Sequence, residues 1–467
     1  MSGKPSMVVN VFRGRAMPAA PAAPGLYNGL LLYQCAVLGL AMCAIYTNAP
    51  IYLYTLHASV PPKYLYFLLV LLMAPCLLAR RSLLPAYLLS PFALWAGALV
   101  VVNLIHLSTW STGGEAGGTY LVDQAGQVRA ALVLTRIQYI MIAVVLGFVV
   151  FVTPVRTWLY AAVVPMVLLP CAVLLDFAYP GMFYQLDIEG AVLGRAAAMF
   201  INPTMAGEAL LHVFILGSAV IGLRYRGPLL LLTGAAVLVT FSRSSIVAWG
   251  ILLIILIARG ALPRSMAVTT IVALVALALG LGSFESYLQS RDDFEGASSN
   301  ILSRLDFFSN LSFEDDSSEE RASVVKAGWE LFLDNPVFGA GAGSTLFWSH
   351  RGSTHNQLLM LAAEYGLFGI GLWTWLLVIL WRGRFFAERA LQLAMVFLFA
   401  WMSMFTHQML DADTYWLATF ALVSTRAAWT VPGRALHARA QYGRARLTRP
   451  ACCPADEDRP VLDRTRS

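Results

Sequence analysis

Long apolar runs, separated by short polar stretches, constrain this chain more than any other feature of its sequence. Several runs approach the roughly 20 residues that an α-helix needs to cross the apolar core of a bilayer. Of the 467 residues, 58% are hydrophobic and only 12% are charged, whereas soluble domains carry about 25% charged residues. The sequence therefore predicts an all-α polytopic membrane protein without a large soluble domain.

We predict about twelve transmembrane helices from these runs. Their approximate limits are 27–46, 61–79, 84–104, 134–153, 157–176, 207–223, 227–241, 245–259, 265–283, 359–381, 390–408 and 412–430. The chain is thereby divided into an N-terminal segment (1–26), nine spans (27–283), a large loop containing short helices (284–358), three spans (359–430) and a basic tail (431–467).

Basic residues assign a side of the membrane to each predicted loop. Arginines follow the even-numbered spans, at Arg80, Arg81, Arg156, Arg224, Arg226, Arg259, Arg264, Arg382, Arg384 and Arg389. Because arginine and lysine are enriched in cytoplasmic loops, these clusters and both termini are predicted to be cytoplasmic, and the loop 284–358 periplasmic. The same loops explain the formal net charge of +6, so this charge does not indicate a nucleic-acid partner.

A polar stretch from Glu320 to Gly369 interrupts the pattern of spans. A helix is predicted from Arg321, with Trp329 on its apolar face, and Asn335–Pro336 ends it because proline lacks the amide proton. The glycines that follow predict a turn whose backbone could lie close to a ligand; they are Gly339, Gly341 and Gly343. The acidic, serine-rich segment 285–318 before this stretch is predicted to be mobile and is a candidate lid.

His355 and Asn356 lie immediately before the next apolar run. A histidine titrates near neutral pH, and an ionisable group at membrane depth is costly unless it is used. We therefore interpret His355 as a general base or a positioning group for an acceptor hydroxyl, with Asn356 in a supporting role. The structural alternative is that His355 caps a helix at the membrane interface.

Three arginines on the predicted outer side indicate a diphosphate ligand, because a guanidinium binds two phosphate oxygens at once. They are Arg195, Arg243 and Arg321, and Asn202 supports the first of them in a turn before the next span. Each arginine alone could instead extend to the membrane interface without a ligand. His350, His407 and Asp176 have no partner at the spacing of a metal site. Asp411 and Asp413 resemble a metal-binding carboxylate pair, but we interpret this lone pair in a tight outer turn as structural, so neither metal nor cofactor is predicted.

Four segments, in chain order, resemble the O-antigen ligase and polymerase superfamily of bacterial inner membranes. They are TFSRSS, the helix from Arg321, NPVFGAGAGS and HNQLLMLAAEYGLFG, and the resemblance covers about 194–207 and 240–369. It implies a metal-independent glycosyltransferase with a periplasmic active site and an undecaprenyl-diphosphate-linked glycan as donor. By this resemblance, His355 corresponds to an essential loop histidine and Arg321 to the arginine of the loop helix. Arg195 and Arg243 correspond to arginines that hold the donor diphosphate.

Twelve spans with one dominant late loop look most like the O-antigen ligase branch, which transfers glycan to a lipid A-core acceptor. O-antigen polymerase and protein O-oligosaccharyltransferase are alternatives within the superfamily. A transporter or flippase is an alternative from another class, but it would show internal repeats and charges deep in several spans. The expected partners are therefore the lipid-linked glycan, the lipid A-core acceptor and membrane lipid, with no nucleic acid.

Overall fold

The computed structural model describes residues 24–56, 61–109, 122–153, 155–184, 195–266, 268–269, 272, 316–346, 348, 354–383, 386, 388–406, 409–410 and 414–427. Every regular element in these ranges is a helix. The helices are α1 (Pro24–Tyr46), α2 (Ala49–Leu56), α3 (Pro62–Ala79), the short 3₁₀ helix η1 (Arg81–Leu83), α4 (Leu84–Leu88), α5 (Pro91–Thr109), α6 (Val122–Val152), α7 (Val155–Ala178), α8 (Pro203–Ser218), α9 (Leu223–Val239), α10 (Arg243–Ala258), α13 (Asp316–Asp334), α14 (Gln357–Arg382), α15 (Arg389–Met402) and α16 (Thr414–Ala427). The predicted all-α class is confirmed for these residues.

Five of the described helices are long and apolar enough to cross a membrane. They are Pro62–Ala79, Pro91–Ser108, Arg129–Val152, Trp158–Ala178 and Gln357–Arg382, and the bent pair Leu32–Tyr46 and Ala49–Leu56 would make a sixth. Shorter apolar helices occupy Arg243–Ala258, Arg389–Met402 and Tyr415–Ser424. The protein is thus consistent with a polytopic membrane protein, while the total of about twelve spans stays a prediction.

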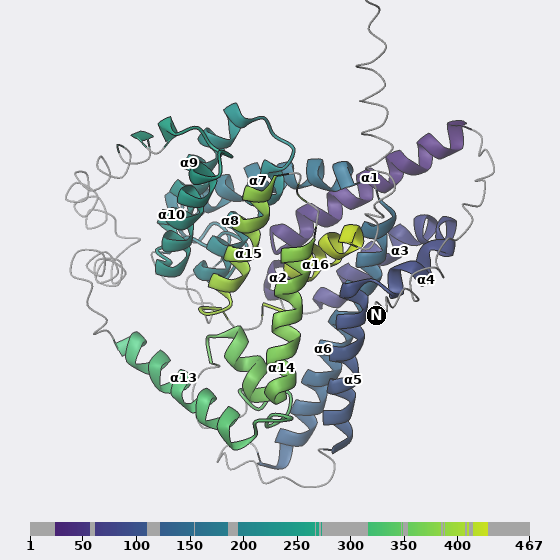
Figure 1. Cartoon of the computed structure of the whole chain (residues 1–467), viewed down its shortest axis with the longest axis vertical. Coiled ribbons are helices and arrows are strands. Elements are labelled where there is room, and N and C mark those ends of the chain that lie inside the picture. Colours follow the sequence, from purple (N-terminus) through teal and green to yellow (C-terminus); the bar gives the residue numbers. More distant parts are fainter. Residues whose placement is uncertain are drawn as a thin grey trace, which may run out of the picture.

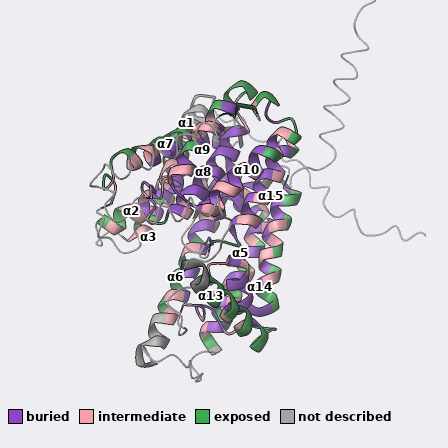
Figure 2. Ribbon diagram, turned by 90° about the vertical axis from the view of Figure 1, so that its left-hand side faces the viewer, coloured by how far each residue is buried: buried purple, intermediate pink, exposed green. Residues whose placement is uncertain are grey.

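The helices pack into one bundle around α8 (Figure 1). Nearly every residue of α8 is buried, and α7, α9, α10 and α15 pack against it. On the other side, α5 packs against both α6 and α14, while α16 packs against α6. Figure 2 shows the buried residues concentrated in the middle of this group. Helix α13 lies at the edge and packs against α14 (Figure 1).

The third predicted span begins later than the apolar run suggested. The first residues of the expected helix 84–104 form the separate short helix α4, which follows η1, and the long helix α5 starts only at Pro91. Ser90 explains this start, because its side-chain oxygen accepts a hydrogen bond from the amide of Ala93 at 3.3 Å. A serine N-cap followed by proline at the first helical position favours a new helix over continuation of the old one.

The tenth predicted span, 359–381, is present but is not straight. Gly366 has φ 65° and ψ −145° and breaks α14 into a short part, 357–365, and a longer part that follows it. A Cβ on Gly369 would lie 1.9 Å from the carbonyl oxygen of Leu361. A straight helix would separate two residues eight positions apart by about 12 Å, so the short part must fold back against the start of the longer part.

Candidate functional site

Two of the predicted arginines, Arg195 and Arg243, lie at one corner of the fold. The Nε atom of Arg195 donates to the carbonyl oxygen of Thr240 at 2.9 Å, and the amide of Ala196 donates to Val239 at 3.2 Å. Thr240 follows the last residue of α9, and Arg243 is the first residue of α10. Both arginines are half-buried. These two hydrogen bonds therefore place Arg195 beside the turn between α9 and α10 that carries Arg243.

Hydrogen bonds from α7 hold the segment that carries Arg195. Asp176, in the last turn of α7, accepts hydrogen bonds from the amides of Ala197 and Ala198, each at 2.9 Å. Two amide donors are what an ionised carboxylate requires when it is removed from water. Asp176 therefore fixes the direction of the chain two to three residues after Arg195.

A group of hydroxyls lies beside the two arginines. Ser242 Oγ lies 3.3 Å from Thr204 Oγ1, 3.3 Å from Ser244 Oγ and 3.0 Å from Ser245 Oγ. Asn202 caps α8 here, with its side-chain oxygen accepting from the amide of Thr204 at 2.8 Å. The corner thus combines two cations with several hydroxyl groups, which is a chemical environment suited to an anionic oxygen-rich ligand.

His355 lies directly before the first residues of α14, where Asn356 is the N-cap. The side-chain oxygen of Asn356 accepts a hydrogen bond from the amide of Leu359 at 2.9 Å, so the capping role of Asn356 is shown. His355 is half-buried. Gln357 ties this start to the rest of the fold, because its amide donates to Ser403 at 2.7 Å and its side-chain oxygen accepts from Met409 at 2.8 Å.

The segment 401–406, together with Met409, joins the start of α14 to the arginine corner. Besides its two bonds to Gln357, it reaches α10, where Trp401 Nε1 donates to the carbonyl oxygen of Ser244 at 3.0 Å. It also reaches α8, where the Thr406 hydroxyl donates to Glu208 at 3.0 Å. His355 and the corner of Arg195 and Arg243 are therefore arranged around one common segment.

Backbone strain concentrates in the same region. Among the described residues, positive φ outside glycine occurs at Asn48 (60°), Ala198 (49°), Phe241 (48°) and His355 (48°). Ala198 accompanies Arg195, Phe241 precedes Arg243 by two residues, and the side-chain amide of Asn48 donates to Met199 at 3.3 Å. Such conformations cost about 1–3 kcal/mol each and gather at functional sites. This distribution supports a functional assignment for the corner and for His355.

Arg321 lies apart from this corner, in the first half of α13. Its side chain is exposed, and α13 meets the start of α14 through Gly328, where a Cβ would lie 2.7 Å from Thr354. Arg321 and Gly328 are seven positions apart, which corresponds to about 10 Å of helix. The predicted helix end at Asn335–Pro336 is confirmed, but Trp329, expected on the apolar face, is 52% exposed.

The glycine-rich turn packs on protein backbone at the break in α14. A Cβ on Gly339, where φ is 73°, would lie 2.3 Å from the carbonyl carbon of Glu364. The amides of Ala340 and Gly341 donate to the carbonyls of Ala363 and Glu364, at 2.8 and 3.0 Å. At Gly339, the turn therefore lies directly against the peptide bond between Glu364 and Tyr365, where a side chain would not fit.

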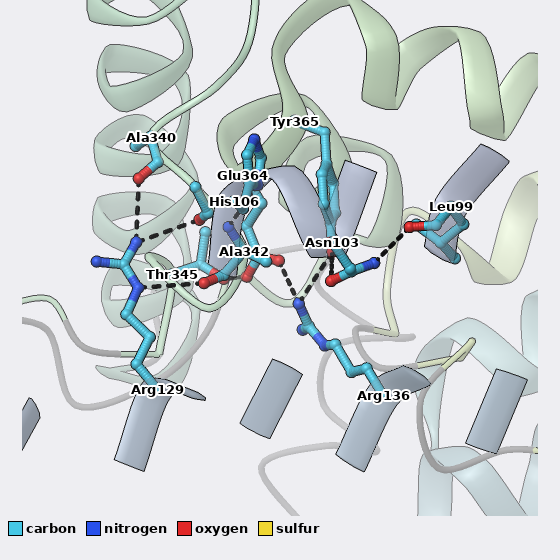
Figure 3. A network of polar contacts seen from close by, with 11 residues as sticks. Leu99, Asn103, His106, Arg129, Arg136, Ala340, Ala342, Thr345, Glu364 and Tyr365 are labelled. Atoms are coloured by element: carbon cyan, nitrogen blue, oxygen red, sulfur yellow. Dashed lines mark hydrogen bonds and ion pairs between the residues drawn. The ribbon is translucent and has the colours of Figure 1, made fainter. Parts of the chain in front are cut away.

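Two arginines of α6, which the prediction did not single out, bind this turn and the helix beneath it (Figure 3). Arg136 Nη1 lies 2.5 Å from a carboxylate oxygen of Glu364. Arg129 donates to the carbonyl oxygens of Ala340 at 3.0 Å and Ala342 at 3.1 Å. For Arg136 the available signal was its charge within the otherwise apolar run 134–153, since such residues are kept in membranes only for a purpose. Arg129 lies outside that run.

The family model described as O-Antigen ligase matches residues 228–374. The match covers less than half of the chain and shows that this segment is similar to that family. Family members are glycosyltransferase-like enzymes of O-antigen pathways. No curated protein sequence matches the chain.

The O-antigen ligase segment contains four of the six predicted site residues, namely Arg243, Arg321, His355 and Asn356. Arg195 and Asn202 precede this segment. Arg195 is held at the corner by its hydrogen bond to Thr240, directly after α9, and Asn202 lies there as the N-cap of α8. Glu364 and the glycine-rich turn also lie within the family segment, whereas Arg129 and Arg136 come from outside it. Among the described residues, histidine, cysteine and carboxylate side chains form no group of three that could hold a metal ion.

Proposed function

We propose that this protein is an O-antigen ligase of the bacterial inner membrane. It transfers a glycan from undecaprenyl diphosphate to a hydroxyl of a lipid A-core acceptor at the periplasmic face. The hydrogen bonds of residues 401–406 and Met409 to Gln357 and to α10 support this proposal most directly, because they connect the start of α14, beside His355, to the corner of Arg195 and Arg243. The similarity of 228–374 to the O-antigen ligase family supports the class of reaction.

In this proposal, Arg195 and Arg243 bind the diphosphate of the donor. Their charges offset the negative charge that develops on the leaving diphosphate, so the step requires no metal or other cofactor. Both are half-buried, which reduces competition from water and strengthens their interaction with phosphate oxygens. Arg321 binds the donor from the side of α13, and Asn202 supports the corner by capping α8.

His355 acts as the general base. It removes the proton from the acceptor hydroxyl while that oxygen attacks the anomeric carbon and the bond to the diphosphate breaks. A direct displacement of this kind inverts the anomeric configuration. Asn356 supports the histidine, because the cap that it provides fixes the backbone immediately after His355.

The test is a transfer assay with purified protein and lipid-linked glycan, carried out with and without lipid A-core. An O-antigen ligase forms glycosylated lipid A-core only when the acceptor is present, and His355→Ala serves as the inactive control. Lengthening of the lipid-linked glycan without acceptor would instead identify a polymerase. The absence of any covalent product in both reactions, from protein that still binds donor, would reject the enzyme and favour a transporter.

A further inference from the structure

A buried ion pair connects two predicted spans below the glycine-rich turn (Figure 3). The side chains of Arg136 and Glu364 are 5% and 0% exposed, and their closest atoms are 2.5 Å apart. The second carboxylate oxygen of Glu364 accepts a hydrogen bond from Thr345 at 2.8 Å. Both oxygens of a fully buried carboxylate are thus bound, one by a cation and one by a hydroxyl of the turn.

Glu364 occupies a particular place relative to the candidate base. The short part of α14, 357–365, begins two residues after His355 and contains Glu364 in its last turn. Because Gly366 breaks the helix, the short part does not continue the axis of the longer part, although Leu361 packs against Gly369 of that part. Besides this packing, hydrogen-bonding contacts fix the short helix, and through it the position of His355.

Those contacts lie at its two ends. At the end beside His355, Gln357 is bound to Ser403 and Met409. At the other end, Glu364 binds Arg136, and Tyr365 donates to Asn103 of α5 at 3.1 Å.

The glycine-rich turn reinforces the second end. His106 of α5 accepts a hydrogen bond from the amide of Ala342 at 3.1 Å and stacks on Tyr365 with ring centroids 5.3 Å apart. Arg129 binds the carbonyls of the same turn. Helices α5 and α6 therefore hold both the turn and the last residues of the short helix.

We propose that Arg136 and Glu364 are positioning residues for His355. The ion pair fixes the far end of the short helix against α6, so that the near end presents His355 toward the arginine corner at a constant distance. Neither residue touches the reacting atoms. This inference rests on the proposed role of His355 as the base, and it predicts that breaking the pair slows transfer without weakening donor binding.

The first measurement compares kcat and donor KM in Glu364→Gln, Arg136→Gln and the variant that combines both. A displacement of about 1 Å at a reacting group can lower a rate roughly 100-fold, and we expect a fall of this order in kcat with KM unchanged. Each single variant leaves one buried group without its partner. The combined variant should therefore recover part of the kcat that either single variant loses.

A second ion pair in the same chain provides a control. Arg226, also 5% exposed, binds Glu388, which is 41% exposed, through two hydrogen bonds of 2.6 Å between α9 and the residue before α15. The hydrogen bonds of Arg226 go to Glu388 and to the carbonyl oxygen of Ala261, and not to the short helix of α14. Arg226→Gln should therefore leave kcat unchanged, and an equal loss of kcat in this variant would overturn the assignment.

A cross-link reports the position of the short helix independently of activity. Gly328 on α13 faces Thr354, the residue before His355. Cysteines at these two positions should form a disulfide under mild oxidation, which mass spectrometry of the linked peptides measures. We expect Glu364→Gln to remove most of this cross-link and Arg226→Gln to preserve it.

These measurements separate the proposed role of His355 as the base from the proposed positioning role of Arg136 and Glu364. If His355→Ala keeps its rate, the proposed base is wrong, whereas the cross-link still tests whether the ion pair positions residue 354. An unchanged kcat or an unchanged cross-link in Glu364→Gln would overturn the positioning role, as would a loss of donor binding at constant kcat. If Glu364→Gln does not fold, Arg136→Lys replaces it, since it keeps the charge but loses the planar fork. An unchanged kcat in that variant would equally overturn the role.

Discussion

Replacing Gly339 with alanine tests whether the glycine-rich turn is held against the break in α14. The new Cβ would lie 2.3 Å from the carbonyl carbon of Glu364 and 2.4 Å from both the carbonyl oxygen of Glu364 and the amide nitrogen of Tyr365. These are backbone atoms within the most constrained part of the helix, so they cannot move aside as a flexible side chain would. The turn itself must move away.

The energetic cost follows from two contributions. Alanine at a left-handed φ, such as the 73° of Gly339, costs about 1–2 kcal/mol. Displacement of the turn weakens the hydrogen bonds from Ala340 to Ala363 and from Gly341 to Glu364, each worth about 0.5–1.5 kcal/mol. We therefore expect Gly339→Ala to lower the free energy of unfolding by about 2–5 kcal/mol.

Gly371→Ala is the matched control, because Gly371 lies in the longer part of α14 and a Cβ there would meet no atom within 4 Å. Alanine in a helix is more favourable than glycine by up to about 1 kcal/mol, so this variant should be as stable as the parent protein or slightly more so. The assay is unfolding by SDS titration in mixed micelles, followed by far-UV circular dichroism. Equal midpoints for both variants would refute the packing described for the turn.

Three further outcomes are expected. His355→Ala should abolish transfer and keep donor affinity, because proton removal matters only in the transition state; lost donor binding with an intact single-turnover rate would make His355 a diphosphate ligand instead. Arg195→Ala should weaken donor binding by about 2–5 kcal/mol, as measured by donor titration, and Arg195→Lys should recover only part of this because lysine lacks the fork. Asp176→Asn should raise the donor KM with little change in kcat, since the amides of Ala197 and Ala198 lose a charged acceptor; a parent-like KM would show that Arg195 is placed without it.

Local signals predicted several elements correctly. Asn335–Pro336 ends α13 as expected, because the chemistry of proline acts over only a few residues. Asn356 caps α14 in the structure, whereas the sequence predicted only a supporting role for it. Arg195 and Arg243 lie at one turn, and their predicted place on the outer side of the membrane stays a prediction.

Features that depend on distant contacts were not predictable in the same way. The apolar run at 359–381 has the composition of one helix, and only the backbone of Pro336 and Val337 packed against Gly366 shows why the helix breaks there. The pairing of Arg136 with Glu364 joins residues from separate spans. The sequence shows that each charge lies in an apolar run, but it contains no local signal for which partner each one meets.

The separation of this pair along the chain has a consequence for how the protein is made. Glu364 follows Arg136 by 228 residues, and at about 5–20 residues per second the ribosome needs roughly 10–45 s to synthesise that distance. Arg136 enters the membrane with the rest of Arg129–Val152 before its carboxylate exists. During this interval the guanidinium must extend to the interface, where lipid headgroups and water can solvate it. Once Glu364 has been synthesised and inserted, the guanidinium of Arg136 can move into the membrane core and pair with it. Helices α6 and α14 can be joined by this ion pair only from that point on.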